Sequence, residues 1–583
     1  MPSDTLKRTL RDPVVLLALG LLAVLAVLVL VPVAGLVSST LRPEGLDAWR
    51  DVLTGRLAPA LLHEPLLNSL LVGAVTAIGA VVIGGGLAWV VVMTDVPLRR
   101  TITFLASVPF ALPSFALALA WESVFRNDLV GGRVGLLTDL GLTVPDWLAW
   151  GPVPVSATLI AHYYSLSFLL TAAALATVNS ELVEAAELTG ASRLRVARSI
   201  ALPVVLPAVI SGALLAFAEG VSNFAAPAVL GLPVRFHTLS TRAYGAITTG
   251  QTERGYVLSV VLVVVAAIVL LVSTRLAGRR KSFATITGKG ARRKRVRLGA
   301  ARLPVTAAVL LLVALTSIVP GLLLLTSSLL ERTGSFTSGF TTHFWTGASD
   351  PSMAQGMAGI LRNPQIVSAF WTTLALGLSV AVAASVLGLL LGYVMTRLRP
   401  ADPLQAGLGK GLALLSYLPF LVPGVALGAA FIAQFGRPIG PLPALYGTFA
   451  ILVIAGVAAT LPFASQAGRS AVGQISPDVE EAATTAGAGL GRRLFSIVLP
   501  LSSRGLLAGG VLVFVNIVRD LSLLVLLVTP ATPLLSVLTY RYASEGFTQF
   551  ANAVTVVIVV ISLAATLFAR RLEGASQPWL EER

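Results

Sequence analysis

The sequence predicts an all-α polytopic membrane protein whose twelve transmembrane helices form two parallel six-helix repeats. Hydrophobic residues make up 56% of the 583 positions and charged residues only 12%, whereas soluble domains contain about 25% charged residues. Apolar runs long enough to cross a bilayer core, about 20 residues each, recur along the whole chain. Because a backbone in hydrocarbon must satisfy its own hydrogen bonds, these runs are expected to be helices.

The apolar runs define twelve expected spans. The first run follows Lys7, Arg8 and Arg11 and is too long for the apolar part of a signal peptide, so we expect a first transmembrane helix rather than a cleaved leader. The spans lie near residues 13–38, 66–94, 102–122, 156–178, 204–229, 256–275, 303–329, 367–395, 411–434, 443–467, 503–528 and 550–570.

Basic residues orient the spans and divide the chain. Residues 275–302 contain eleven Lys or Arg and no acid, so we expect a first domain at 1–274, a basic cytoplasmic linker at 275–302 and a second domain at 303–583. The positive-inside rule places the linker and both termini in the cytoplasm. The net charge of +15 then reflects loop position and contact with membrane lipid, and no nucleic-acid partner is expected. With no cysteine, disulfides and thiolate metal sites are excluded.

The two halves repeat one another in sequence. SVPFALPSFALALAW at 107–121 matches YLPFLVPGVALGAAF at 417–431, and EAAELTGASRLRVARSIALP at 184–203 matches EAATTAGAGLGRRLFSIVLP at 481–500. Each half holds an even number of spans, so both insert the same way up. The surface between two such parallel repeats is a natural place for a translocation path.

The repeated polar segments, 184–203 and 481–500, are called the first and second elbow here. Glu and Ala favour a short helix, a glycine can end it, a second short basic helix follows, and Pro203 or Pro500 suits the first turn of the next span. An elbow of this kind, with a surface of small residues, is suited to docking a cytoplasmic partner. Its candidate contact residues are Glu184, Ala185, Ala186 and Gly190, and Glu481, Ala482, Ala483 and Gly487.

This pattern resembles the EAA motif of the permease subunits of ATP-binding-cassette (ABC) importers, and each half resembles one permease domain of the type I class. The resemblance implies that each elbow is a coupling helix that docks on one of two cytoplasmic ATPase subunits, and that a periplasmic or lipid-anchored binding protein delivers the substrate. The fusion of two halves, together with LPFLVPGVALGAAF, LYGTFAILVI, LSTRAYGAITTG and VRDLSLLVLLVTPATPLLSVLTY, is most similar to the ferric-iron permeases of the iron and thiamine branch.

No nucleotide site is expected in this chain. It lacks the G-x-x-x-x-G-K-[ST] phosphate loop, since TGKGARR and GLGKGLA have no upstream glycine at the required spacing and no following Ser or Thr. The chain is therefore expected to be a transport subunit rather than an enzyme. No cofactor is expected in it, and ATP and Mg²⁺ would bind on the partner ATPases.

Ionisable and amide side chains inside spans are the candidate pathway residues, because they are costly in a membrane. Glu219 and Asn516 each lie 16 residues past the elbow proline, and Asn223 and Asp520 each lie 20 past it. The repeats therefore exchange a carboxylate and an amide, and the four-residue spacing predicts one helical face for each pair. The oxygen ligands suit a hard cation. The alternative is a structural polar clamp in which Arg519 neutralises Asp520.

Other polar and aromatic residues have simpler expectations. Glu122 is expected at the headgroups, and His162, Tyr163 and Tyr164 are expected to anchor a helix at the interface. Phe217 and Phe514, which match between the repeats, are expected to pack, and the glycines at 84–86 are expected to permit close helix packing. The four histidines form no recognisable metal motif.

The leading functional expectation is ATP-driven import of ferric iron. Thiamine, polyamine, phosphonate and sulfate remain open within the same importer class. An ion-driven secondary transporter would also have repeats and buried carboxylates but would not need paired elbows. A membrane enzyme is disfavoured, because the sequence shows no clustered metal ligands, no nucleophile elbow and no nucleotide fingerprint.

Overall fold

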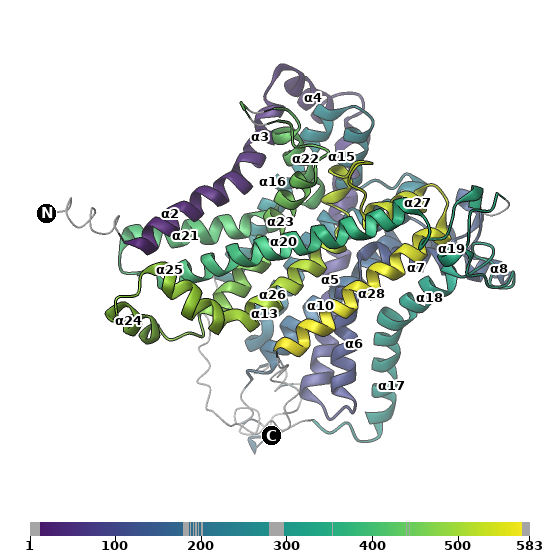
Figure 1. The fold of residues 1–583 in the computed structure, drawn as a ribbon. Coiled ribbons are helices and arrows are strands. Elements are labelled where there is room, and N and C mark those ends of the chain that lie inside the picture. The colour runs from purple at the N-terminus through teal and green to yellow at the C-terminus, as the bar shows by residue number, and fades with distance from the viewer. Residues whose placement is uncertain are drawn as a thin grey trace.

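The computed structural model describes residues 12–178, 186, 188–190, 192, 195, 198–199, 202–278, 296–351, 354–438, 440–441 and 443–573. Within these residues ten helices are long and apolar enough to cross a membrane, and two bent helix pairs bring the number to twelve. The expected all-helical membrane class is confirmed (Figure 1), and the candidate spans overlap the expected ones, with differences at their ends.

The spans of the first half are interrupted by short irregular turns. They comprise α2 (Pro13–Leu25), η1 (Ala26–Leu30) and α3 (Val31–Thr40); η2 (Pro59–His63) and α5 (Glu64–Met93); α6 (Arg99–Ala111) with α7 (Ser114–Phe125); α10 (Pro152–Leu175); α13 (Leu202–Ser222); and α16 (Thr252–Gly278). Smaller helices lie between them, at α4 (Pro43–Leu53), η3 (Asp128–Val130), α8 (Leu136–Asp139), α9 (Asp146–Ala149), α14 (Ala225–Leu230), η5 (Leu232–Val234) and α15 (Leu239–Thr248).

The second half follows the same order. Its spans comprise η6 (Gly299–Ala301), α17 (Arg302–Val313), η7 (Ala314–Ile318) and α18 (Val319–Ser328); α20 (Pro364–Arg397); α21 (Pro403–Tyr417) and η9 (Leu418–Leu421) with α22 (Gly424–Phe435); α23 (Phe449–Val472); α25 (Leu490–Arg493), η10 (Leu494–Val498) and α26 (Leu499–Val518); and α28 (Thr548–Glu573). Smaller helices are α19 (His343–Thr346), η8 (Ala354–Gly356), α24 (Pro477–Thr485), η11 (Leu524–Leu526) and α27 (Leu535–Ser544).

The third span of each half is bent rather than straight. α6 and α7 meet at 96°, and α21–η9 and α22 meet at 108°. The bends fall at Pro113 and Pro423, which are the N-cap residues of α7 and α22 and have extended backbones. A proline cannot continue a helix without losing a hydrogen bond, and it disfavours the helical conformation in the residue before it. The matched prolines of the repeat therefore produce matched bends.

The first span of each half packs on the other half. α2 lies against α21 and α3 against α22, while α17 lies against α6 and α18 against α7. In Figure 1 the α2–α3 helix lies along α21 and α22, and the α17–α18 helix lies along α6 and α7. Each bent pair thus extends along a whole spanning helix, as expected for a pair that crosses the bilayer. The halves are interlocked rather than simply adjacent.

Four π-helical turns share one sequence feature. η1, η2, η7 and η10 each end two residues before a proline, at Pro32, Pro65, Pro320 and Pro500. A proline removes one backbone donor and its ring collides with the carbonyl four residues earlier, and a π-turn widens the helix at that point. This corrects one expectation, because Pro500 does not begin a span. It lies inside a continuous helical run from Leu490 to Val518.

Glycines set the closest helix contacts. A Cβ at Gly84 would collide with the backbone of α10 at Tyr164, and one at Gly388 would collide with the backbone of α23 at Ala464. A Cβ at Gly85 would meet nothing within 4 Å, so the expected packing role of the glycine run at 84–86 is confirmed for Gly84 and wrong for Gly85. The equivalent helix pairs α5–α10 and α20–α23 therefore pack backbone to backbone, which holds each half rigid.

Candidate functional site

The fifth span of each half ends earlier than its apolar sequence suggests. α13 ends at Ser222 and α26 at Val518, and short buried helices follow them. The expected spans 204–229 and 503–528 are therefore wrong at their outer ends. Glu219 and Asn516 lie in the last turn of their helices. Asn223 directly follows α13, and its amide still donates to the Glu219 carbonyl at 2.9 Å, so this pair keeps the helical spacing expected for one face. Asp520 lies two residues beyond α26 and its amide donates to the Ile517 carbonyl, so the second pair does not.

Asn223 and Asp520 hold the two breaks in the same way. The Ala226 amide donates to Asn223 Oδ1 at 3.0 Å, and the Leu523 amide donates to Asp520 Oδ1 at 2.9 Å. Each side chain satisfies a backbone donor that a broken helix would leave open, as a helix cap does. The residues that follow make matching contacts too: Ser240 donates to the Asn223 carbonyl and Ser536 to the Asp520 carbonyl, both at 2.8 Å.

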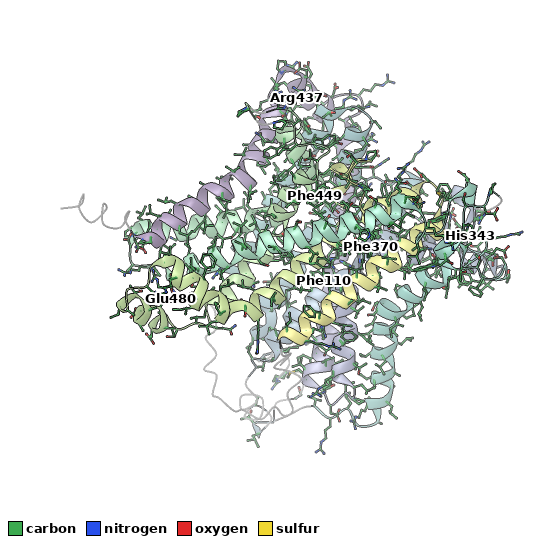
Figure 2. The ribbon with its side chains drawn as sticks, viewed as in Figure 1. Phe110, His343, Phe370, Arg437, Phe449 and Glu480 are labelled. Carbon is green, nitrogen blue, oxygen red and sulfur yellow. The ribbon has the colours of Figure 1, made fainter. Side chains whose placement is uncertain are left out.

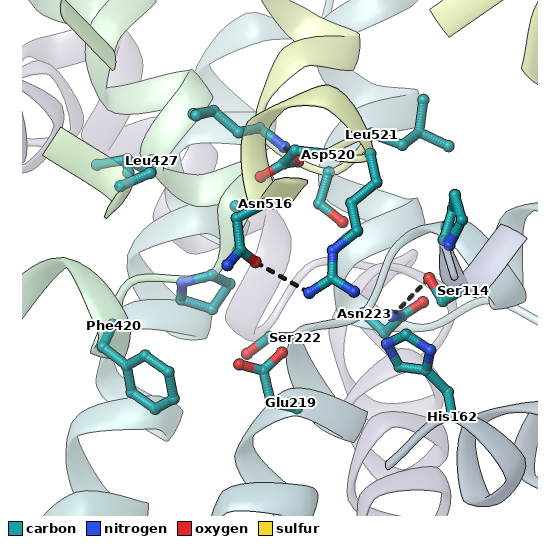
Figure 3. Close-up of a pocket in the computed structure, with 18 of the residues that line it drawn as sticks. Ser114, His162, Glu219, Ser222, Asn223, Phe420, Leu427, Asn516, Asp520 and Leu521 are labelled. Atoms are coloured by element: carbon teal, nitrogen blue, oxygen red, sulfur yellow. Dashed lines mark hydrogen bonds between the residues drawn. The ribbon is translucent and has the colours of Figure 1, made fainter. Parts of the chain in front are cut away.

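All five candidate pathway residues line one cavity between the halves. The cavity has a volume of about 210 Å³, and Figure 3 shows Glu219, Asn223, Asn516 and Asp520 around it. Pro113 and Pro423, which set the bends of the two third spans, also line it. The two bends and the two breaks therefore meet at one place, where the regular helices of both halves stop.

The first half contributes a hydrogen-bonded polar network to the cavity. The Tyr163 hydroxyl donates to Glu219 Oε2 at 3.2 Å, and Asn223 Nδ2 donates to Tyr163 and to Ser114 at 3.2 Å each. His162 lines the same wall, with its ring centroid 4.6 Å from that of Tyr163. The expectation that His162 and Tyr163 anchor a helix at the membrane interface is therefore wrong, since both are buried.

The second half contributes a single cation, Arg519. Its Nη2 donates to Asn516 Oδ1 at 3.0 Å (Figure 3), and the guanidinium lies 4.7 Å from the centre of the Phe110 ring. Its Nη1 is buried without a hydrogen-bond partner. Its charge is close enough to Glu219 and Asp520 to attract both, although neither carboxylate is within 4.0 Å of it. The expected neutralisation of Asp520 by Arg519 therefore remains a prediction.

An aromatic cluster joins the halves beyond the break of the first half. The Phe224 ring lies 4.8 Å from the Tyr244 ring of α15 and 5.5 Å from the Tyr540 ring of α27, and the two tyrosines are 6.2 Å apart. Tyr244 and Tyr540 occupy matching positions in LSTRAY and LSVLTY. Phe224 is fully buried. The cluster therefore lies next to Asn223, which lines the cavity.

The remaining polar and aromatic candidates have structural environments. Glu122 forms an ion pair with Arg126 near the end of α7, and its side chain is only 12% exposed; its expected place at the headgroups remains a prediction. Phe514 lies against the position that a Cβ on Gly377 would occupy, and Phe217 lies in the same way at Gly73. The two phenylalanines pack as expected, at matching places in the two halves.

The second elbow has the expected helix–turn–helix form. α24 carries Glu481, Ala482 and Ala483, Gly487 has a φ of 84° in the turn, and α25 begins the continuous run into α26. Glu481 and Ala482 are exposed. Figure 2 shows Glu480, the residue before this motif, where α24 projects from the helix bundle, far from Phe110 at its middle.

Most of the first elbow lies outside the described residues, including Glu184 and Ala185. Ala186 is helical, and Gly190 has a φ of 82°, close to that of Gly487. The two elbow glycines therefore adopt the same left-handed conformation, which supports equivalent turns. The contact roles of the elbow residues remain predictions.

Comparison with known proteins places both halves in one family. The family model described as binding-protein-dependent transport system inner membrane component matches residues 80–282 and 388–578. The expected duplication is thus confirmed, whereas the expected domain boundaries remain predictions. The two matched regions include α10 and α23, both sides of the cavity and the second elbow.

Full-length relatives share the fused architecture. The ferric transport system permease protein FbpB of Actinobacillus pleuropneumoniae is 25% identical over 88% of this chain and 71% of its own length. A probable ABC transporter permease protein of Sinorhizobium fredii is 27% identical over 94% of both chains. A putative ferric transport system permease protein of Haemophilus influenzae is 26% identical over 82% of this chain and 72% of its own length. With the family model matched in both halves, the chain belongs to the family of binding-protein-dependent transport system inner membrane components.

Proposed function

We propose that this chain is the membrane-spanning subunit of an ATP-driven importer of ferric iron. The cavity between the halves carries the proposal, because it lies at the interface of two parallel repeats and is lined by carboxylate, amide and hydroxyl oxygens. Such ligands suit a hard cation. Two of the full-length relatives are named as ferric transport permeases, which favours iron over thiamine, polyamine, phosphonate or sulfate.

The elbows are proposed to connect the cavity to two separate ATPase subunits. The exposed small-residue surface of α24 and its projection from the bundle support docking on a cytoplasmic protein (Figure 2). In this scheme closure of the ATPase pair drives the elbows together and turns the cavity outward, and hydrolysis resets it. Both termini and both elbows would lie in the cytoplasm. ATP and Mg²⁺ would bind only to the ATPases, and a periplasmic or lipid-anchored protein would supply the iron.

The test is reconstitution of the chain in liposomes with the ATPase and binding protein encoded beside it. Binding protein loaded with ferric iron is expected to stimulate both ATP hydrolysis and uptake of radiolabelled iron, and the chain alone is expected to hydrolyse no ATP. Thiamine, a polyamine, phosphonate and sulfate serve as competing loads. Stimulation by one of these and not by iron would contradict the substrate, and uptake driven by a proton gradient without ATP would contradict the importer class.

A further inference from the structure

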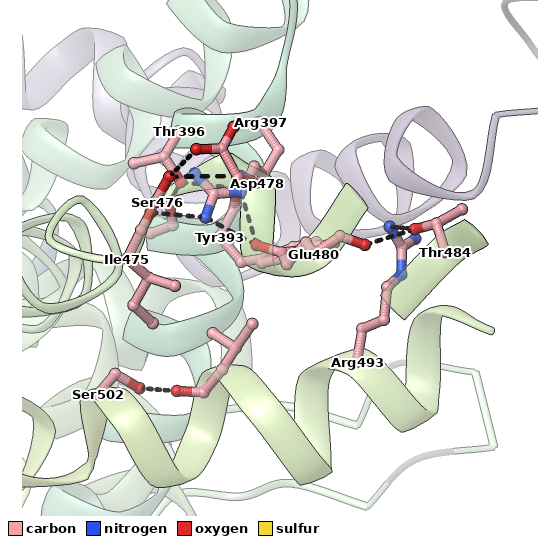
Figure 4. A network of polar contacts seen from close by, with 12 residues as sticks. Tyr393, Thr396, Arg397, Ile475, Ser476, Asp478, Glu480, Thr484, Arg493 and Ser502 are labelled. Carbon is pink, nitrogen blue, oxygen red and sulfur yellow. Dashed lines mark hydrogen bonds and ion pairs between the residues drawn. The ribbon is translucent and has the colours of Figure 1, made fainter. Parts of the chain in front are cut away.

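One buried ion pair fastens the second elbow to the rest of the protein. Arg397 is the last residue of α20, and Glu480 lies in α24 directly before Glu481. Arg397 Nε donates to Glu480 Oε1 at 2.7 Å, and Arg397 Nη2 donates to the Ile475 carbonyl at 3.1 Å. The two side chains are only 14% and 5% exposed. Figure 4 shows this contact, which we call the Arg397–Glu480 clamp.

Neighbouring contacts make the clamp part of a rigid unit. Tyr393, one helical turn before Arg397, lies next to Glu480 (Figure 4), and it is only 1% exposed. At the other end of α24, Arg493 Nη1 donates to Thr484 Oγ1 at 2.9 Å. α24 is therefore held to α20 at one end and to α25 at the other (Figure 4).

The clamped helix also reaches the cavity wall. A Cβ on Gly377 of α20 would lie 2.7 Å from the Phe514 ring of α26. Phe514 is two residues before Asn516, which lines the cavity. Packed contacts therefore run from α24 through Arg397 to α20, and from Gly377 of α20 to the end of α26. A continuous set of packed contacts links the elbow to the cavity.

The first half has no charged residue at the two positions that match Arg397 and Glu480. Val183 stands before the first EAA motif where Glu480 stands before the second. α5 ends in Met93 as α20 ends in Arg397. Val183 lies outside the described residues, so the comparison rests on side-chain chemistry alone. Neither valine nor methionine carries a charge, so these two residues cannot pair as Arg397 and Glu480 do.

We propose that Arg397 and Glu480 are positioning residues that make the second elbow a rigid lever, through an ion pair that the first half lacks at the matching positions. The inference rests on the proposed function, since a lever requires an ATPase to push it. A buried ion pair contributes little net stability compared with a well-packed apolar pair, but it can fix one particular arrangement. Its value here is in holding α24 at one angle to α20.

The first test measures the clamp without any partner. The chain has no cysteine, so Thr485→Cys on α24 and Lys410→Cys on α21, both exposed, introduce two spin labels and no others. The unmodified clamp is expected to give one narrow distance distribution. Arg397→Met with Glu480→Val, the residues of the first half, is expected to broaden it, and Glu480→Gln provides a milder variant if the double variant does not fold. An unchanged distribution in a folded variant overturns the clamp.

The matched control removes an ion pair that fastens no elbow. Arg541 and Glu545 pair at 2.8 Å on α27 with side chains 56% and 42% exposed. Arg541→Met with Glu545→Val is expected to leave the label distances unchanged. A broadening as large as that of the clamp variant would mean that general destabilisation, and not the clamp, controls the elbow.

The second test measures coupling in the reconstituted importer. The clamp variant is expected to bind its ATPase and to hydrolyse ATP at the basal rate. It should lose about fivefold or more of its iron uptake per ATP, within the usual range of coupling between sites. Broadened label distances with unchanged uptake per ATP would overturn the lever role. If the unaltered chain recruits no ATPase, the proposed function fails instead, and the label experiment still tests the clamp.

Discussion

Removal of the Arg519 charge distinguishes a substrate path from a structural clamp. Arg519→Met keeps much of the side-chain volume but leaves two carboxylates, Glu219 and Asp520, facing the cavity without a cation. Adding Glu219→Gln removes one of them, and the remaining Asp520 still accepts the Leu523 amide at 2.9 Å. We therefore expect the single variant to be unstable and the double variant to recover most of the lost stability.

The contacts of Arg519 set the expected loss of stability in the Arg519→Met variant. Two unit charges 4 Å apart attract by about 4 kcal/mol at an effective dielectric constant of about 20, and each carboxylate lies beyond that distance from Arg519. The stacking of the guanidinium 4.7 Å above Phe110 adds about 1–2 kcal/mol in a desolvated site. A net loss of about 3 kcal/mol is expected, which corresponds to about 2–3 °C in the midpoint of thermal denaturation for a chain of this length.

The assay pairs thermal denaturation in detergent with iron uptake in liposomes. If the cavity is the path, the double variant has a denaturation midpoint near that of the unaltered chain and still loses about tenfold or more of its uptake, since two charged side chains that line the cavity, Glu219 and Arg519, are gone. Uptake that returns together with stability would refute the pathway and support the clamp. If the denaturation midpoint of the double variant is as low as that of Arg519→Met, the unpaired carboxylate charge is not the cause of the instability.

Three further predictions concern packing, the elbow turn and the aromatic cluster. Gly468→Ala should destabilise the fold by about 1–3 kcal/mol, measured as a lower denaturation midpoint, because its Cβ would collide with the backbone of α20; Gly85→Ala, with open space around it, should not. Gly487→Ala should cost about 1–2 kcal/mol in the elbow, because its φ is 84°, and should weaken ATPase binding in a pull-down; equal binding would contradict the turn. Phe224→Ala should make reconstituted liposomes leak small ions, because it removes the ring shared by both tyrosines; tight liposomes would show that the cluster seals nothing.

The fold could be predicted largely because hydrophobicity reports spans directly. The two errors at the ends of the fifth spans have one cause: AAPAVL after Asn223 and SLLVLLV after Asp520 are as apolar as a membrane helix. Those short segments are buried in protein rather than lipid, and hydropathy does not distinguish the two environments. The Asn223–Phe224 and Arg519–Asp520 positions, polar groups inside apolar runs, are where the sequence could have indicated a break.

The residues that line the cavity could be predicted in part, because positions in the two halves can be compared by counting from the elbow prolines. Counting from the elbow prolines found Glu219, Asn223, Asn516 and Asp520 at equivalent places, and all of them line it. Tyr163 was misjudged because an aromatic residue early in a span usually lies at the interface. The packing of each first span on the opposite half depends on contacts distant in sequence, and no local pattern could indicate it.

The composition of the cavity requires two different halves. Ser222 stands in the first half where Arg519 stands in the second. Two identical subunits would place either two arginines in the cavity or none, and would repeat the same carboxylate on both sides. One chain that carries both halves ensures that each assembly has a single cation between two carboxylates, one from each half. The same reasoning applies to the Arg397–Glu480 clamp, because two identical subunits would carry this ion pair in both halves or in neither.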